Sequence, residues 1–235
     1  MIADAVDANY DSAIFIEGAS FFAGVCNYPS GAIFCGEKFT EVTEVINRHT
    51  GQRWMDRNLG AQRTAYIPND MRSFGDLYQW GRFSDGHQCR NSATTDELAE
   101  SNQPEHDLFI ITSSGNRDWR TSGELSMWEG IKGENNPCPE GFRIPTKAEW
   151  RAEIDSWSHP SLSGAFRSRL ALPAAGWRNS SGAIPAHGTS GHYWTSTVDN
   201  DRIVSLALFG SRALFTSQPP SMGLSVRCIK DRAME

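Results

Sequence analysis

The chain has 235 residues with eight tryptophans and twelve phenylalanines, yet hydrophobic residues make up only 39% of it. We expect one large domain, or a domain with an appendage, whose core is built from a few large aromatic side chains. The formal net charge is −6 and the basic residues form no cluster. This argues against nucleic acid as the main partner, because binding phosphates requires concentrated positive charge.

The N-terminal sequence, MIADAVDANYDS, is acidic and lacks the basic start of a secretory signal. No apolar stretch approaches the roughly 20 residues that span a bilayer, so we expect no membrane insertion. Residues 1–40 include an apolar, glycine-interrupted stretch. We interpret them as an N-terminal arm for attachment or oligomerisation; an edge hairpin of the main domain is the alternative. Residues 41–235 are expected to form the main domain.

The first elements of this domain are predicted to be a hairpin and a short turn-like segment. Apolar residues around Val45 and Trp54 are separated by an HTG turn, which indicates two paired strands. In residues 70–82, Asp70 is a suitable N-cap, whereas Gly75 disfavours a helix. One short helix and a series of turns both fit this segment.

Residues 83–136 are mostly polar. Only residues 108–111 have the apolar character of a buried strand or an anchored loop. A structureless loop of this length is uncommon inside a compact domain. We therefore expect an ordered insertion that Trp119 and Trp128 hold against the domain.

The clearest helix signal follows a proline- and glycine-framed turn and the strand-like run Phe142–Ile144. Thr146 is a suitable N-cap, and Glu149 stands three residues later, where a capping box requires it. An apolar helical face then recurs at i, i+4 and i+7, formed by Trp150, Ile154 and Trp157. This segment predicts one amphipathic helix.

The C-terminal part predicts an antiparallel meander of short strands. Residues 193–197 are rich in strand formers, 199–201 supply a turn, and 203–209 form the apolar run of a central strand covered on both faces. Strands at 213–215 and 224–229 complete it. The fold class is therefore α+β, with small antiparallel sheets, one or two helices and long ordered loops.

Several sequence blocks occur in order from about Gly51 to Asp231: WMDRNLGA, GDLYQWGR with SDGHQ, NPCPEGFRIPTKAEW, LPAAGWRNSSG, GHYWTST and GLSVRCIKD. Together they resemble the Fibrobacter succinogenes major paralogous domain, a family regarded as part of the C-type lectin fold superfamily. The resemblance implies a C-type lectin-like fold for residues 41–235. In that fold the termini meet in a small sheet, and a long loop region presents a binding surface.

The five cysteines are Cys26, Cys35, Cys89, Cys138 and Cys228. Their number is odd and no CxxC pair occurs, which disfavours a zinc ribbon and a thioredoxin-type site. Five reduced, buried thiols are one interpretation. The resemblance implies instead that Cys138 and Cys228 lie close enough for a disulfide. Cys26 with Cys35 is a second possible pair.

Relatives with this fold occur as bacterial surface proteins, as phage tail and receptor-binding proteins, and as ligand-binding proteins of diversity-generating retroelements. Because no signal is present and an arm precedes the domain, we predict a non-catalytic phage virion protein of tail-fibre, receptor-binding or adhesin type. A structural virion component and a bacterial surface or extracellular binding domain are the alternatives. The expected partners are a host cell-surface glycan or protein, other virion subunits, and further copies in a homo-oligomer.

The chain also resembles the sulfatase-modifying, formylglycine-generating enzymes, which share the fold. Their chemistry needs a late pair of reactive cysteines, whereas Cys228 is the only late cysteine here. We therefore predict no catalytic residue and no cofactor. Sugar-binding C-type lectins hold calcium through EPN or QPD before WND, and neither pattern occurs in that context. The DND triplet at 199–201 has suitable oxygen ligands, but we interpret it as a turn, so no metal site is predicted.

Ligand contacts are expected between Trp177 and Met222, where aromatic residues alternate with arginine and amide side chains. Such side chains suit a saccharide or a protein surface. Trp177 and Trp194 are interpreted as core residues, and the polar residues beside them as the contacts. These candidate ligand-binding residues are Arg178, Asn179, His192, Tyr193, Asp199, Asn200, Arg202 and Arg212.

Overall fold

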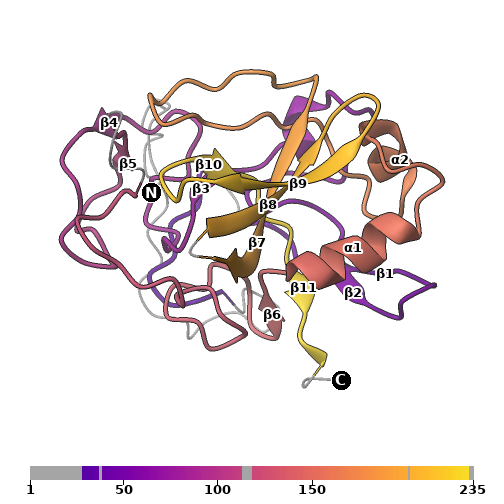
Figure 1. The fold of residues 1–235 in the computed structure, drawn as a ribbon, viewed down its shortest axis with the longest axis horizontal. Helices are drawn as coiled ribbons and strands as arrows, with labels where there is room; N and C mark the ends of the chain where they lie inside the picture. Colours follow the sequence, from indigo (N-terminus) through magenta and orange to yellow (C-terminus); the bar gives the residue numbers. More distant parts are fainter. Residues whose placement is uncertain (1–27, 37–38, 113–117, 201, 233–235) are drawn as a thin grey trace, which may run out of the picture.

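The computed structural model describes residues 28–36, 39–112, 118–200 and 202–232. In this part of the chain, small sheets and two helices are joined by long loops, an α+β arrangement (Figure 1). None of the described helices is long and apolar enough to cross a membrane.

A four-stranded sheet brings distant parts of the chain together. Its strand order is β1 (Glu44–Ile46), β2 (Arg53–Met55), β11 (Ile229–Lys230) and β6 (Phe142–Arg143). All neighbours are antiparallel, and Ile229 lies opposite both Trp54 and Arg143. The predicted hairpin of β1 and β2 is confirmed. The last strand therefore lies between the start of the domain and the strand before α1.

A second sheet consists of β7 (Gly191–Asp199), β8 (Arg202–Leu208) and β9 (Ala213–Gln218), in that order and antiparallel. The prediction of a central, covered strand is confirmed, because β8 has a strand on each side and is buried from Ile203 to Leu208. Figure 1 shows α1 and α2 near this sheet at the right of the view.

The predicted amphipathic helix is α1 (Lys147–Asp155). The Thr146 side chain accepts a hydrogen bond from the Glu149 backbone, and the Glu149 carboxylate accepts one from the Thr146 backbone, so the capping box is complete. Trp150 is buried between the two sheets. Its ring centre lies 4.8 Å from that of Trp54, and its indole N–H donates to the backbone oxygen of Trp194 at 3.2 Å.

The remaining elements are short. A 3-10 helix, η1 (Met71–Ser73), is capped by Asp70. β3 (Tyr78–Gln79) pairs with β10 (Gly223–Leu224), and β4 (Thr94–Thr95) pairs in parallel with β5 (Phe109–Ile110). The insertion is thus ordered in its described part. Its two tryptophans are fully buried: Trp119 donates to the Trp80 oxygen at 2.8 Å, and Trp128 to the Asn135 oxygen at 2.8 Å.

The structure differs from the prediction in three places. The strand expected at 224–229 is divided into β10 and β11, because the chain crosses from one sheet to the other and buries Arg227 on the way. The segment 70–82 forms η1 and then the unpredicted strand β3, because Gly75 adopts a φ of 68° and turns the chain between them. A helix, α2 (Leu162–Arg167), was not predicted. The expected apolar hairpin near residues 13–25 lies outside the described residues.

Two disulfides connect the described chain. Cys138 and Cys228 join the turn before β6 to the residue before β11, with an S–S length of 2.09 Å. Cys35 joins Cys89, with an S–S length of 2.12 Å. The possible pairing of Cys26 with Cys35 is therefore wrong, because Cys35 is already bonded to a cysteine of the main domain.

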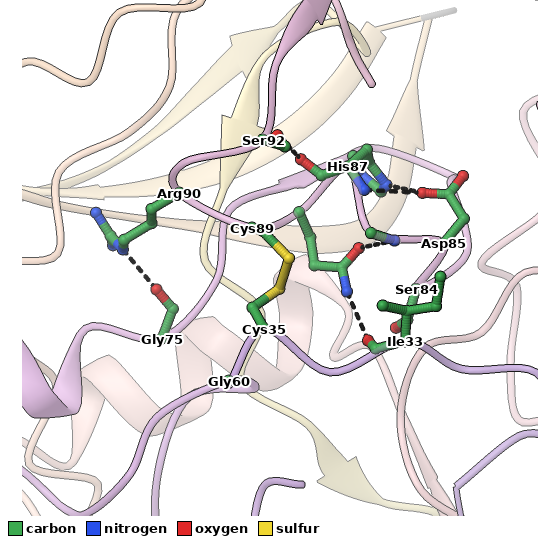
Figure 2. Close-up of a disulfide and its surroundings, with 12 residues drawn as sticks. Ile33, Cys35, Gly60, Gly75, Ser84, Asp85, His87, Cys89, Arg90 and Ser92 are labelled. Carbon is green, nitrogen blue, oxygen red and sulfur yellow. Dashed lines mark hydrogen bonds and ion pairs between the residues drawn. A yellow bond between two sulfur atoms is a disulfide. The ribbon is translucent and has the colours of Figure 1, made fainter. Parts of the chain in front are cut away.

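The Cys35–Cys89 bond holds the described part of the N-terminal segment against the domain (Figure 2). Next to it, the Gln88 side-chain amide donates to the Ile33 oxygen at 2.8 Å, and the Ile33 N–H donates to the Ser84 oxygen at 2.7 Å. Residues 28–36 therefore pack on the domain, whatever the function of residues further toward the N-terminus.

Candidate ligand-contact surface

The eight predicted contact residues do not form one surface. Four are exposed and occupy the turns of the three-stranded sheet: Asp199, Asn200, Arg202 and Arg212. Asn179 is half-buried, and its side-chain oxygen accepts hydrogen bonds from the backbone of Ser181 and Ala183, so it stabilises its own turn. The other three, Arg178, His192 and Tyr193, are buried.

The expectation for Tyr193 and His192 is corrected by their burial. The Tyr193 hydroxyl donates to the Pro173 oxygen at 3.0 Å, and burial raises the pKa of Tyr193 to about 12. The His192 ring packs on Trp177, with 4.4 Å between ring centres, and burial lowers the pKa of His192 to about 4. As neighbours in β7 the two residues lie on opposite faces of the strand, and both faces are covered there, so the first half of β7 is buried throughout.

Arg178 is likewise a structural residue. Its guanidinium donates to the Ser92 hydroxyl at 2.6 Å, to the Ser92 backbone oxygen at 2.7 Å and to the Gly182 oxygen at 3.0 Å. It also lies 4.1 Å from the ring centre of Phe109. Burial lowers the pKa of Arg178 to about 10, so it remains charged at neutral pH. The side chain ties two loops together and is not available to a ligand.

The exposed candidates lie at opposite ends of the sheet. Asp199, Asn200 and Arg202 flank the turn between β7 and β8, whereas Arg212 precedes β9. At about 3.3 Å per residue, β8 separates these ends by roughly 20 Å. One small ligand cannot touch both groups.

A hollow of about 330 Å³ borders the first group. It lies between the insertion and the C-terminal end of β7. Val198, which lines it, directly precedes Asp199 in the sequence. Asp199 in turn lies 3.9 Å from the ammonium group of Lys147. The hollow is lined by Leu125, Glu129, Gly130, Arg143, Thr146, Ser196 and Val198. Of these residues, Arg143 is paired with Glu149 at 2.7 Å.

A larger, open hollow of about 630 Å³ lies within the insertion. Its lining is polar and acidic: Glu100, Ser101, Asn102, Gln103, Ser122, Gly123, Glu124 and Glu134. The buried Arg120 lies beneath it and donates to the Asn102 side chain at 3.1 Å and to the Glu124 backbone at 3.0 Å. Among the described residues, no group of three or more histidines, cysteines or carboxylates could hold a metal ion.

The most exposed apolar side chains belong to a different segment, residues 64–72, which we call the apolar loop. Tyr66 is 72% exposed, Ile67 54% and Met71 76%. They are three of the six large hydrophobic residues that are exposed in the described chain. Several large apolar side chains exposed on one short loop are a feature of contact sites.

Asp70 fixes the shape of the apolar loop from inside. Its buried carboxylate accepts two hydrogen bonds from the Arg63 guanidinium, at 3.0 and 3.1 Å, and further ones from the backbone N–H groups of Tyr66 and Arg72. The hydrogen bonds from Arg63 are the largest cause that lowers the pKa of Asp70. The same guanidinium lies 4.5 Å from the Tyr66 ring centre and supports it. The loop therefore presents its apolar side chains in one conformation.

Sequence reasoning missed this surface. The local signal was two large apolar residues, Tyr66 and Ile67, directly before a Pro-Asn-Asp turn and outside any helix or strand periodicity. That signal places them in a loop, where burial is the exception. The bidentate contact between Arg63 and Asp70, which orders the loop, is not visible in the sequence.

Comparison with known proteins finds a family model that is similar to part of this chain. Residues 48–156 match the family model described as the Fibrobacter succinogenes major domain. No curated protein and no solved structure matches the chain. The matched segment includes the apolar loop and ends just after α1, while the three-stranded sheet lies beyond it. Residues 48–156 of the chain are thus similar to the Fibrobacter succinogenes major domain.

Proposed function

We propose that this protein is a non-catalytic binding domain with a C-type lectin-like fold, carried on a phage virion. In this proposal its apolar loop contacts a protein on the host surface. The observation that carries it is the exposure of Tyr66, Ile67 and Met71 on a loop that Asp70 holds in place.

The arrangement of the chain supports the lectin-like fold. The last strand, β11, lies between β2 and β6, so the two ends of the domain meet in one small sheet. The disulfide Cys138–Cys228 fastens this junction. A long, ordered insertion then departs from the sheet, as expected for a fold that displays loops.

The disulfides support a location outside a reducing cytosol, where such bonds form and persist. Both intrachain bonds link segments far apart in the sequence, with separations of 54 and 90 residues. A virion exposed to the medium meets this condition, and so does the alternative, a bacterial surface or extracellular domain. Cys228 supports the non-catalytic role, because its sulfur is buried and bonded and offers no thiolate.

The chemistry of the apolar loop favours a protein as the ligand. Ile67 and Met71 offer no hydrogen bond to sugar hydroxyls, whereas Tyr, Met and Arg are the residue types enriched at protein interfaces. Burying three such side chains would contribute about 1.5–3 kcal/mol each before the costs of association are subtracted. Arg72, exposed beside Met71, adds a positive charge that suits an acidic rim on the partner.

The test is binding of the purified protein to host cells and to their envelope fractions. The double variant Tyr66→Ser with Met71→Ser should bind at least tenfold more weakly, with an unchanged melting temperature. The matched control is Val42→Ser with Ile46→Ser, because these residues are also large, apolar and exposed. Unchanged binding by the double variant would refute the assignment of the apolar loop.

A second contact surface is the turn between β7 and β8 with its adjoining hollow. The predicted residues Asp199 and Arg202 are exposed there. If Asp199→Ala with Arg202→Ala abolishes binding while the apolar-loop variant binds normally, this turn is the contact site. Binding that responds to soluble sugars rather than to protease treatment of the cells would identify a glycan as the ligand.

The alternative of a structural virion component predicts a different result. The protein would be incorporated in particles, but the purified protein would not bind to host cells. Masking the protein on isolated particles would leave their attachment to host cells unchanged. Antibody labelling of particles would show whether it lies on the head or the tail. Absence from particles, together with presence on bacterial cells, would support the surface-domain alternative.

A further inference from the structure

The strand β9 leaves one edge of the three-stranded sheet without a neighbour in the described chain. Its backbone groups alternate between the two sides. Arg212 directs its oxygen toward β8, where it accepts from Phe209 N–H at 2.8 Å, whereas Ala213 N–H points the other way and donates to the Pro160 oxygen at 2.6 Å. By alternation, Phe215 and Ser217 also point away from β8.

The outward groups of Phe215 and Ser217 have no hydrogen-bond partner among the described residues. The strand, ALFTSQ, also contains no charged residue and no proline. Proteins usually protect an edge strand with such residues or by keeping it short. The edge strand β1, for comparison, has three residues and carries Glu44. β9 is therefore an edge prepared to accept another strand.

The outer edge of β7 differs, although that strand is longer. The Trp194 N–H donates to the Ser225 oxygen at 3.0 Å, the Ser225 N–H donates to the His192 oxygen at 3.0 Å, and the Ser196 N–H donates to the Pro145 oxygen at 2.9 Å. These contacts cover the edge. The uncovered backbone thus lies on one side of the sheet only.

We propose that β9 pairs with β9 of a second copy of this chain, antiparallel and with Thr216 opposite its own symmetry mate. In this register Phe215 of each copy lies opposite Ser217 of the other. Each such pair exchanges two backbone hydrogen bonds, so the open groups of Phe215 and Ser217 in both strands are satisfied at once. The two sheets become one continuous sheet across a two-fold axis.

The side chains favour a second copy over an unrelated strand. On one face the two Thr216 side chains meet as a close, non-hydrogen-bonded pair, and Leu214 lies opposite Gln218. On the other face Phe215 lies opposite the small Ser217. Every position that the symmetry brings together is uncharged, so no like charges of β9 oppose each other.

Charges near the edge make the association salt-dependent. The ammonium group of Lys147 lies 6.0 Å from the Phe215 ring centre, and the Arg151 guanidinium lies 4.9 Å from it. In the pair, these cations of the two copies come near each other on the same face, and each chain has a net charge of −6. Screening weakens both repulsions. The dimer should therefore form more readily at 0.5 M than at 0.02 M NaCl.

The register is tested by cross-linking. In a Cys26→Ser background, which removes the cysteine outside the two described disulfides, Thr216→Cys should give a covalent dimer on non-reducing gels, since the two Thr216 side chains are adjacent across the axis. Leu214→Cys is the matched control on the same face of the same strand, and it should remain monomeric because it faces Gln218.

The interface is tested by measuring mass against concentration in analytical ultracentrifugation. The unaltered chain should shift from one chain to two as concentration rises. Ser217→Pro should weaken this association at least tenfold, because it removes an outward N–H while leaving the bonds to β8 intact. Ser217→Thr keeps the N–H and should dimerise.

Three results would overturn the proposal. One is a monomer at all concentrations and at both salt concentrations, without a Thr216→Cys cross-link. Another is a dimer that persists in a folded Ser217→Pro variant, which assigns the contact to a different surface. The third is equal cross-linking through Leu214→Cys, which excludes the register. None of these results bears on binding through the apolar loop.

Discussion

Asp76 is a buried carboxyl group whose ionisation should control stability near neutral pH. Burial raises the pKa of Asp76 to about 7, although the nearby Arg90 opposes this. The carboxyl group lies directly over Gly60, where a Cβ would come within 2.2 Å of the Asp76 Cγ. It therefore keeps its proton in the folded chain at pH values at which it is ionised in the unfolded chain.

The sign of the pH effect follows from this difference. Between pH 3.8, the ordinary pKa, and pH 7, the folded chain binds one more proton at Asp76 than the unfolded chain does. The contribution of Asp76 to the free energy of unfolding is thus fully present below pH 3.8 and is lost as the pH rises through 7. The interval corresponds to about 4 kcal/mol as an upper limit, at 1.36 kcal/mol for each pH unit.

The perturbation that isolates this group is Asp76→Asn, which is uncharged at every pH. Urea unfolding of both chains at pH 4.5, 6, 7 and 8.5 gives the difference in the free energy of unfolding. We expect the free energy of unfolding of the variant, relative to that of the unaltered chain, to rise by about 2–4 kcal/mol from pH 4.5 to pH 8.5. A difference that stays constant over this range would refute the reasoning, because other titrating groups cancel in the comparison.

Three further predictions concern stability. His192 has its pKa lowered from 6.5 to about 4 by burial, so it stabilises the fold above pH 6.5 and this contribution is lost as the pH falls toward 4; His192→Gln should remove that loss in the same unfolding assay. Gly60→Ala should destabilise the chain by more than 2 kcal/mol, seen as a lower melting temperature, because φ is 79° and the added Cβ would overlap the buried carboxyl group. Replacing Cys138 and Cys228 by Ala should lower the free energy of unfolding by about 4–5 kcal/mol, because the disulfide closes a loop of 90 residues. The unaltered chain, denatured without reduction, should show one free thiol at most, that of Cys26.

Local sequence signals predicted the elements whose causes are local. The capping box of Thr146 and Glu149 involves residues three apart, so both its halves are visible in the sequence and α1 begins where they require. The apolar run of β8 likewise needs only its own composition to indicate a strand with neighbours on both sides.

Elements that depend on distant contacts were not predicted. Within α2, only Leu162, Gly164 and Ala165 are buried, too few for a helical period to appear. Glycine is required at position 164 because a Cβ there would lie 1.9 Å from the backbone oxygen of His159. The pairing of Cys35 with Cys89 has the same origin, because the spacing of cysteines does not determine their connectivity.

The candidate site shows most clearly where prediction from the sequence fails. Arg178 and Tyr193 have residue types that suit ligand contact, but their partners are backbone oxygens of remote segments, and those oxygens leave no trace in the sequence. Conversely, Tyr66 and Met71 have types that suit a core, yet they are exposed on a loop whose backbone is hydrogen-bonded to Asp70. Residue type predicts burial only on average, and a loop can reverse it.

The buried arginines explain how a loop-rich chain keeps such surfaces rigid. A loop that packs inward carries backbone oxygens without strand partners, and each needs a hydrogen-bond donor. One guanidinium has five N–H groups and can serve several segments at once. Arg227 donates to the Leu170 oxygen at 2.7 Å, the Met55 oxygen at 3.3 Å and the Asn58 side chain at 2.9 Å.

Arg82 does the same for the insertion. It donates to the Leu108 oxygen at 2.9 Å and to the His106 oxygen at 2.8 Å, and pairs with Asp85 at 2.6 Å. Lysine could not replace it, because a single ammonium group cannot reach several fixed oxygens in one plane. Order imposed on loops before a ligand arrives reduces the entropy lost on binding. These charges inside the protein are therefore part of the reason that the loops of this chain keep fixed positions.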